Sequence, residues 1–327
     1  MNDMLQLNGY DLTLKTNGRE YKVISDADLE IQKGEIVGLI GESGCGKSML
    51  WKSMLGLADP NRWMVSGEAV LNGVKLDIKD KDSMSEIRGN HAAVILQDPM
   101  SSFDQVFTIE YHFIETAKAH KQWSDKEIHD KAVALLKRMF IREPEKVLKM
   151  YPFQCSGGML QRVMIAIAMM MDAPLIIADE PTTAVDVTIQ REITAMLKEV
   201  NRERGTSILF ISHDLKIIED IADRIYVMYA GSMVESFPAE KLRTAQVRHP
   251  YTIKLLQARP SFTRDYLPTL EGNLPTLSER REGCPFAPRC GFAEEKCRAY
   301  DMKRYSAGDK HMVRCWKYKD IYETDRS

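Results

Sequence analysis

The octapeptide GESGCGKS at residues 41–48 leaves this chain few possible folds. It follows the apolar run EIVGLI at residues 35–40, which predicts a buried β-strand. It also fits the pattern G-x-x-x-x-G-K-[ST] at every fixed position. In a strand–loop–helix unit of this kind, backbone N–H groups and the helix N-terminus point at a bound phosphate. The sequence therefore predicts an α/β fold with a polyphosphate site after its first buried strand.

The residue types in this loop suit a nucleoside triphosphate. Glycines let the backbone curl around the phosphates, a lysine supplies charge to the β and γ phosphates, and a hydroxyl can ligate Mg²⁺. We expect the nucleotide to contact the loop and the residue that follows it: Gly41, Ser43, Gly44, Cys45, Gly46, Lys47, Ser48 and Met49.

The run LIIADE at residues 175–180 predicts a second buried strand that ends in two acids. Asp179 would hold Mg²⁺ through water, and Glu180 could polarise the attacking water as a general base. Two acids after a strand, taken alone, are commonly part of a solvated loop. Their presence in a chain that also has a phosphate loop favours a nucleotide hydrolase.

The rest of the chain predicts an α/β core with one helical insertion and a different C-terminal region. Short β-type segments open the chain, and apolar runs at residues 92–96, 207–211 and 224–230 predict further strands. Residues 107–150 hold amphipathic helical patterns, such as residues 127–140, without a convincing strand. From about residue 259, prolines interrupt any long helix and most of the cysteines follow.

Charge and hydropathy exclude two classes of protein. The formal net charge of −2 lacks the basic footprint of a nucleic-acid-binding protein. The longest apolar stretch, near residues 163–171, is shorter than the ~20 residues that a membrane-spanning helix needs. The N-terminus lacks the basic start and apolar block of a secretory signal, so we expect a globular protein in the cytosol.

Four of the six cysteines lie near the C-terminal end, in the spacing C-x5-C-x6-C-x17-C. In a reducing cytosol such a cluster is more typical of a metal site than of disulfides. Four thiolates suit a tetrahedral Zn²⁺ or a [4Fe–4S] cluster, and the absence of close cysteine pairs favours the cluster. Zn²⁺ and unpaired thiols remain alternatives. The expected ligands are Cys284, Cys290, Cys297 and Cys315.

Between the two phosphate motifs lies CSGGMLQR, residues 155–162, directly before a long apolar helix. This segment resembles the signature of the ATP-binding-cassette (ABC) family, which reads LSGGQ or a close variant. Ser156, Gly157 and Gly158 match, whereas Cys155 replaces the usual Leu or Phe. In the family this signature closes on the phosphate loop of a second cassette. The resemblance implies that Ser156, Gly157, Gly158 and Gln161 contact ATP in trans.

Other marks of the family follow in the expected order. Gln97 matches the glutamine loop that contacts Mg²⁺ and water, Asp186 matches the D-loop, and His213 matches the switch histidine that reads the γ-phosphate. Tyr21 is the one aromatic residue in the zone where the family stacks adenine, although it could equally be an ordinary strand residue. The resemblance implies Glu180, His213 and Gln97 as catalytic residues, and Ser48, Gln97 and Asp179 as Mg²⁺ ligands.

The second half of the chain resembles the ATPase subunits of peptide and nickel importers. The segment HPYT at residues 249–252 fits that subfamily, and GCPFAPRC at residues 283–290 resembles its GCxFxxRC box. The implied fold is a cassette over residues 1–258, with a RecA-like sheet, an N-terminal antiparallel β part and a helical subdomain at about residues 99–172. A Pro- and Cys-rich extension with a metal site would occupy residues 259–327.

The resemblance implies a function and a set of partners. We expect an ATPase, dependent on ATP and Mg²⁺, that powers peptide import from the cytoplasmic face of the membrane as a peripheral protein. It would pair with a homologous ABC ATPase beneath two transmembrane permease subunits, fed by an extracytoplasmic substrate-binding protein, without nucleic acid. A nickel or metallophore importer is the alternative. A soluble ABC ATPase of DNA repair or translation is disfavoured by the −2 charge and the single cassette.

Overall fold

The computed structural model describes residues 3–183, 186–258, 272–280, 282–299 and 302–320. They form two compact units. The first, here called the helical unit, is built mainly on Asp80–Ile211. The second, here called the phosphate-loop unit, contains Leu5–Ile31, Ile36–Lys79 and the chain from Ser212 onward. Among the described residues, no helix is both long enough and apolar enough to cross a membrane.

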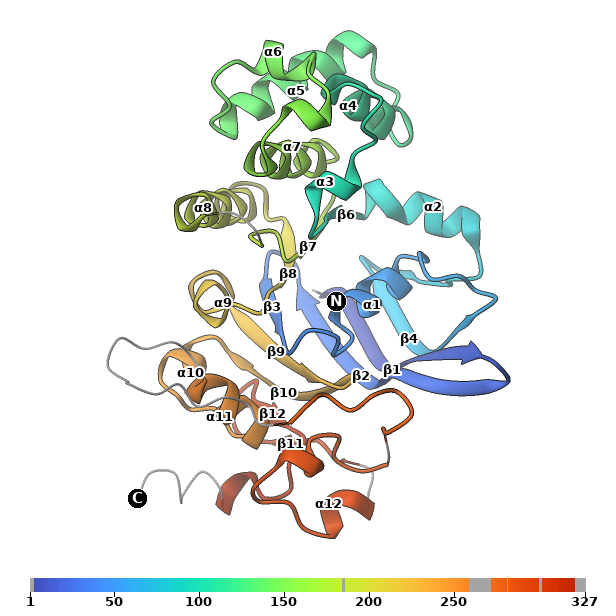
Figure 1. Ribbon diagram of the computed structural model, residues 1–327, viewed down its shortest axis with the longest axis vertical. Helices are drawn as coiled ribbons and strands as arrows, with labels where there is room; N and C mark the ends of the chain where they lie inside the picture. Colours follow the sequence, from blue (N-terminus) through green and yellow to red (C-terminus); the bar gives the residue numbers. More distant parts are fainter. Residues whose placement is uncertain (1–2, 184–185, 259–271, 281, 300–301, 321–327) are drawn as a thin grey trace. The chain divides into compact units, whose positions relative to one another are not determined.

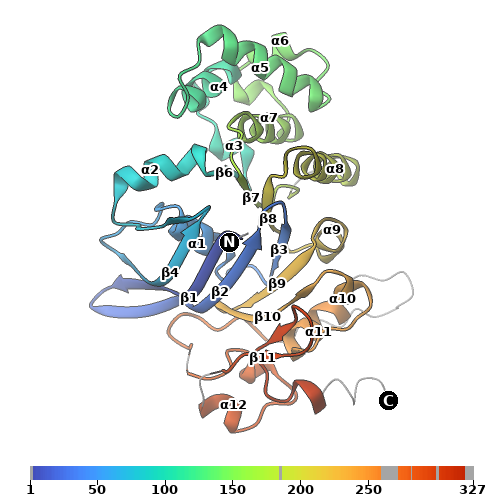
Figure 2. The ribbon, with the colours of Figure 1, turned by 180° about the vertical axis from the view of Figure 1, so that it is seen from behind.

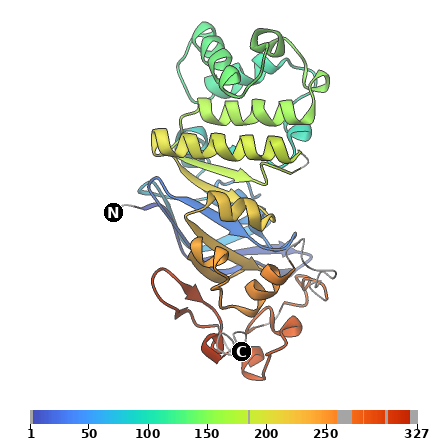
Figure 3. The same cartoon turned by 90° about the vertical axis from the view of Figure 1, so that its left-hand side faces the viewer.

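Parallel strands form the centre of the helical unit. β7 (Leu175–Asp179) lies between β6 (Ala92–Ile95) and β8 (Ser207–Ile211), and both neighbours pair with it in parallel. Every residue of β7 and β8 is buried, as expected for a parallel strand covered on both faces. The helices α7 (Gly157–Met170) and α8 (Val187–Arg204) run side by side (Figures 1 and 3), joined by a 2.6 Å ion pair between Arg162 and Glu192.

The segment between β6 and β7 is helical throughout its regular elements, as the sequence predicts. It contains α3 (Pro99–Ser102), α4 (Ile109–Lys118), α5 (Asp125–Arg138), α6 (Pro144–Leu148) and the short turn η1 (Pro152–Gln154) before α7 (Figure 2). α5 begins at a capping box between Ser124 and Glu127, and it buries Ile128, Ala132 and Leu136 on one face. The helix α2 (Lys81–Asn90) precedes β6. Of these helices, α4, α5 and α6 lie within residues 107–150, where the sequence predicts helices without a strand.

An antiparallel sheet opens the phosphate-loop unit, in the strand order β2-β1-β4-β5. Its strands are β1 (Asp3–Thr16), β2 (Arg19–Gln32), β4 (Trp63–Leu71) and β5 (Val74–Lys75). The prediction of short opening strands is wrong in length, because β1 and β2 have 14 residues each. Asn17 and Gly18 both adopt positive φ and form a two-residue hairpin turn, so the two long strands pair directly.

A second group of strands in this unit has the order β3-β9-β10-β12-β11. β3 (Ile36–Ile40) is parallel to β9 (Arg224–Tyr229), and β10 (Ser232–Pro238) is antiparallel to β9. The C-terminal extension contributes β12 (Met312–Val313), which pairs with β10, and β11 (Tyr305–Ser306). The helices α1 (Lys47–Met54), α9 (Leu215–Ile221), α10 (Glu240–Arg243) and α11 (Pro250–Gln257) complete the cassette part of the unit. The extension therefore joins a sheet of the cassette directly.

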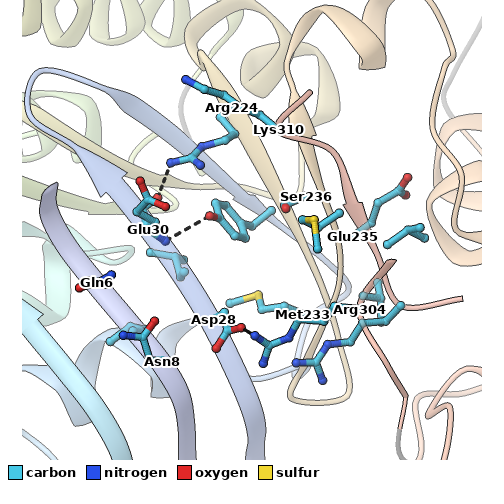
Figure 4. Close-up of a pocket in the computed structure, with 17 residues that line it drawn as sticks. Gln6, Asn8, Asp28, Glu30, Arg224, Met233, Glu235, Ser236, Arg304 and Lys310 are labelled. Carbon is cyan, nitrogen blue, oxygen red and sulfur yellow. Dashed lines mark hydrogen bonds and ion pairs between the residues drawn. The ribbon is translucent and has the colours of Figure 1, made fainter. Parts of the chain in front are cut away.

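The extension also has charged contacts with the N-terminal sheet. A cavity of about 400 Å³ is lined by residues of β1, β2, β9, β10 and the extension. Within it, Arg304 points at Asp28 (Figure 4). Arg304 also pairs with Asp26 at 2.8 Å, and Arg314 pairs with the same carboxylate at 2.7 Å. Strand pairing and these ion pairs attach the extension to the cassette.

Candidate nucleotide-binding and catalytic site

The phosphate loop leaves β3 in a backbone conformation that requires glycine. Gly41 has a φ of 155°, and a Cβ atom there would lie 2.2 Å from the carbonyl oxygen of Met228. Gly46 has a φ of 117° and directly precedes α1. Among the residues that the structure describes, no side chain caps the start of this helix, and N–H groups at a helix N-terminus can bind an anion.

Lys47 is 6% exposed, and its ammonium lies against the loop itself. Its Nζ donates to the carbonyl oxygens of Gly41 and Glu42, at 2.8 and 3.1 Å. Ser43 and Gly44 are exposed at the tip of the loop, whereas Ser48 and Met49 are half-buried at the start of α1. Cys45 is fully buried, and burial raises the pKa of its thiol, so it is an uncharged filler of the loop.

The two acids of the second motif lie at the end of β7 in the helical unit. Asp179, the last residue of the strand, is 4% exposed. Glu180 follows at a φ of 48°, a conformation that carries backbone strain in a non-glycine residue. Its carboxylate accepts hydrogen bonds from Gln97 Nε2 at 3.1 Å and from the Thr183 hydroxyl at 2.9 Å. The structure thus brings the predicted pair Gln97 and Glu180 into contact.

The signature segment begins α7. The Ser156 hydroxyl caps this helix by accepting from Met159 N–H at 3.3 Å, and both Ser156 and Gly157 are exposed. Gly158 is half-buried. Gln161, predicted with them to contact ATP in trans, is only 1% exposed, so its side chain is buried in the helical unit.

The remaining predicted residues lie at the ends of helices or strands. Asp186 caps α8 through Thr188 and Ile189 N–H and is exposed, while residues 184–185 of its motif lie outside the described residues. His213 is exposed just before α9. Tyr21 is half-buried on β2 and lines a cavity of about 700 Å³ together with Arg280 of the extension.

The predicted site residues thus divide between the two units. The phosphate loop, His213 and Tyr21 belong to the phosphate-loop unit, whereas the acids, Gln97, the signature and Asp186 belong to the helical unit. Sequence reasoning missed Thr183 as a partner of Glu180. The sequence feature that could have indicated this partner is the hydroxyl of Thr183, three residues after Glu180.

The four cysteines of the extension line one small cavity, together with His249 and Trp316. All four are free thiols, and burial raises the pKa of Cys284 and that of Cys315 to about 12. Within the described part of the chain, no three His, Cys, Asp or Glu side chains are grouped so as to hold a metal ion. The four thiols therefore line one cavity, without the closer grouping of a metal site in this part of the chain.

Two known families match the chain. The ABC transporter family matches residues 24–183, and the C-terminal region of oligopeptide/dipeptide transporters matches residues 220–297. A putative peptide import ATP-binding protein of Brucella melitensis biotype 1 is 37% identical over 332 residues, covering 97% of this chain and 98% of the relative. The chain belongs to the ABC transporter family. The oligopeptide transport ATP-binding protein AppD of Bacillus subtilis strain 168 is 38% identical, with 98% of each chain covered.

A solved ABC cassette confirms the predicted fold class. It is a dimeric ATP-binding cassette in a post-hydrolysis state with ADP and Pi, and it matches with a TM-score of 0.65 at 26% identity. The match covers 72% of this chain and 99% of that one. As a member of the ABC transporter family, this chain is an ATP-binding cassette of the ATPase kind, as the phosphate loop and signature predict.

Proposed function

We propose that this chain is the ATP-hydrolysing subunit of a peptide importer. The observation that carries the proposal is the match over almost the whole chain, extension included, to relatives named for peptide import and for oligopeptide transport. These relatives favour peptide cargo over nickel, and the family match leaves the DNA-repair and translation alternatives without support. In this proposal the cassette ends near residue 258, where the extension begins.

The site residues would act on ATP as follows. The loop N–H groups and Lys47 would bind the β and γ phosphates, and His213 would read the γ-phosphate. Glu180 would polarise the attacking water as the general base. Its hydrogen bonds from Gln97 and Thr183 would orient the carboxylate. Bound Mg²⁺, held by Ser48, Gln97 and Asp179, would supply charge neutralisation at the phosphates.

Two exposed surfaces would receive the protein partners. A second, homologous cassette would meet the exposed Ser156 and Gly157, whose N–H groups and hydroxyl can contact a γ-phosphate. The loop that follows Gln97 exposes Met100 and Phe107, at 44% and 39%, and would receive the membrane subunits. The chain would thus work at the cytoplasmic face of the membrane beneath two permease subunits, fed by an extracytoplasmic binding protein.

Glu180→Gln tests this proposal. The variant keeps the shape of the side chain but removes the base, so we expect ATP binding to remain while ATP hydrolysis and ATP-driven uptake of labelled peptide fall at least about 100-fold. Glu68→Gln, at a side chain that is 60% exposed on β4, is the matched control and should behave as wild type. Hydrolysis by Glu180→Gln at the wild-type rate would refute the assignment of the base. The cargo assignment would be refuted if the same variant lost uptake of nickel but kept uptake of peptide.

The metal of the extension is a separate proposal. We propose a [4Fe–4S] cluster, with Zn²⁺ as the alternative, held by the four cysteines. The proposal is supported by the spacing of the four cysteines and by the one cavity that all four thiols line. We expect a brown protein with absorption near about 400 nm after anaerobic purification, lost in Cys284→Ser. A colourless wild-type protein with stoichiometric zinc would contradict the cluster.

A further inference from the structure

One side chain of the C-terminal extension reaches the phosphate loop. Nη1 of Arg289 donates to both carboxylate oxygens of Glu42, at 2.9 and 3.0 Å, and to the Tyr229 hydroxyl at 3.2 Å. The exposed fractions of the two charged side chains are 6% for Arg289 and 26% for Glu42. Water therefore screens this ion pair less than it screens a pair on the surface.

The backbone of Glu42 is held as well. Its N–H donates to the Tyr251 hydroxyl at 3.0 Å, and its carbonyl oxygen accepts from Lys47 Nζ at 3.1 Å. Tyr251 is fully buried and belongs to the HPYT segment, at the start of α11. Glu42, the second residue of the phosphate loop, is thus held by the HPYT segment through its N–H and by the extension through its carboxylate.

The folded extension determines where the guanidinium of Arg289 lies. Arg289 ends the short turn η2 (Ala287–Arg289), and its carbonyl oxygen accepts from Lys254 Nζ of α11 at 3.0 Å. Phe286, directly before this turn, is fully buried against Tyr229 and Tyr251, with ring centroids 5.2 and 5.3 Å apart. An aromatic cluster therefore anchors the turn beside the phosphate loop.

The pair has an electrostatic consequence for nucleotide binding. Glu42 places a negative charge in a loop that has to bind a polyanion, and an unneutralised carboxylate there would repel the phosphates. It would also compete with them for the Lys47 ammonium. We propose that Arg289 is a positioning residue for the phosphate loop, through which the C-terminal extension neutralises and holds Glu42 so that ATP can bind. The inference rests on the ATP-binding role of the loop, and it adds a role for the extension.

Titration of the full-length chain with MgATP tests the inference. Arg289→Gln leaves the carboxylate of Glu42 unneutralised, and we expect the Kd for ATP to rise about tenfold, with smaller rises for ADP and for AMP. The double variant Glu42→Gln/Arg289→Gln removes both charges, so its Kd should return to within about threefold of wild type. A purely structural role for Arg289 predicts no such rescue, since the second substitution restores no contact.

Further variants separate the charge effect from loss of the fold. Arg298→Gln, at an exposed position of the same extension, should bind ATP as wild type does. Glu42→Gln alone should bind ATP at least as tightly as wild type, which keeps the inference testable where Arg289→Gln fails to fold. Wild-type affinity in Arg289→Gln, a double variant as weak as that single variant, or a tenfold loss in Glu42→Gln would each overturn the inference. Glu180→Gln should retain ATP binding whether or not Arg289→Gln loses it. Failure of the role of Arg289 can therefore be distinguished from failure of the proposed ATPase function.

Discussion

At the scale of single residues, the extension depends on one buried carboxylate in β10. Glu235 is 2% exposed and accepts from Arg248 N–H at 2.6 Å and from His249 N–H at 3.1 Å. His311 Nε2 lies 2.8 Å from the same carboxylate, and Lys241 Nζ lies 2.9 Å from His311 Nδ1. Because an ammonium only donates, Nδ1 accepts from Lys241 and Nε2–H donates to Glu235. One carboxylate therefore holds the HPYT segment and the loop before β12 together.

Glu235→Ala should destabilise the protein strongly. The substitution leaves two backbone N–H groups and the imidazole N–H buried without an acceptor, at a cost of about 1–3 kcal/mol for each group. Urea unfolding monitored by tryptophan fluorescence should show a lower midpoint. Glu235→Gln keeps one acceptor oxygen and should lose less, while Glu240→Ala, at an exposed position of α10, should unfold as wild type does. A midpoint unchanged in Glu235→Ala would contradict the structural role of this carboxylate.

At the scale of elements, the sequence predicted those strands, helices and loops whose residues have a local pattern. β3, β7 and β8 are continuous apolar runs between turn residues, and α5 has a helical period with a capping box at its start. The phosphate loop was predicted with its helix because glycine spacing and the Lys-Ser pair are local features. The extension was not predicted in this way, because β11 and β12 have two residues each and no periodicity can identify them.

Long-range contacts explain most of what the sequence could not show at the site. The pair Arg289–Glu42 spans 247 residues of sequence, and the bond from Glu42 to Tyr251 spans 209. Each partner, taken alone, reads as an ordinary charged or aromatic residue. The burial of Gln161 is a further example, because this residue follows the exposed Ser156 and Gly157 closely in the sequence yet is 1% exposed. The sequence of α7 does not indicate one covered face, because this helix is apolar and buried on most sides.

At the scale of the whole molecule, the chain carries one phosphate loop and one signature, so a complete ATP site needs a second cassette. We expect that cassette to be a homologous chain. The wild-type chain alone should then hydrolyse ATP at a low rate per chain that does not rise with concentration, and addition of the homologous partner should raise the rate. A homodimer formed by mass action would instead show a rate per chain that climbs with concentration.

Mixing two defective versions of the chain gives the decisive comparison. Lys47→Ala removes the charge that binds the phosphates, and Ser156→Arg blocks the exposed signature, so each version is inactive in a different half of the composite site. In a homodimer, a 1:1 mixture would recover about a quarter of the wild-type sites, because half of the dimers are mixed and each has one intact site. We expect no recovery without the partner chain. Recovery near a quarter of the wild-type rate would show that two copies of this chain form the ATPase, because only then can the signature of one copy complete the phosphate loop of the other.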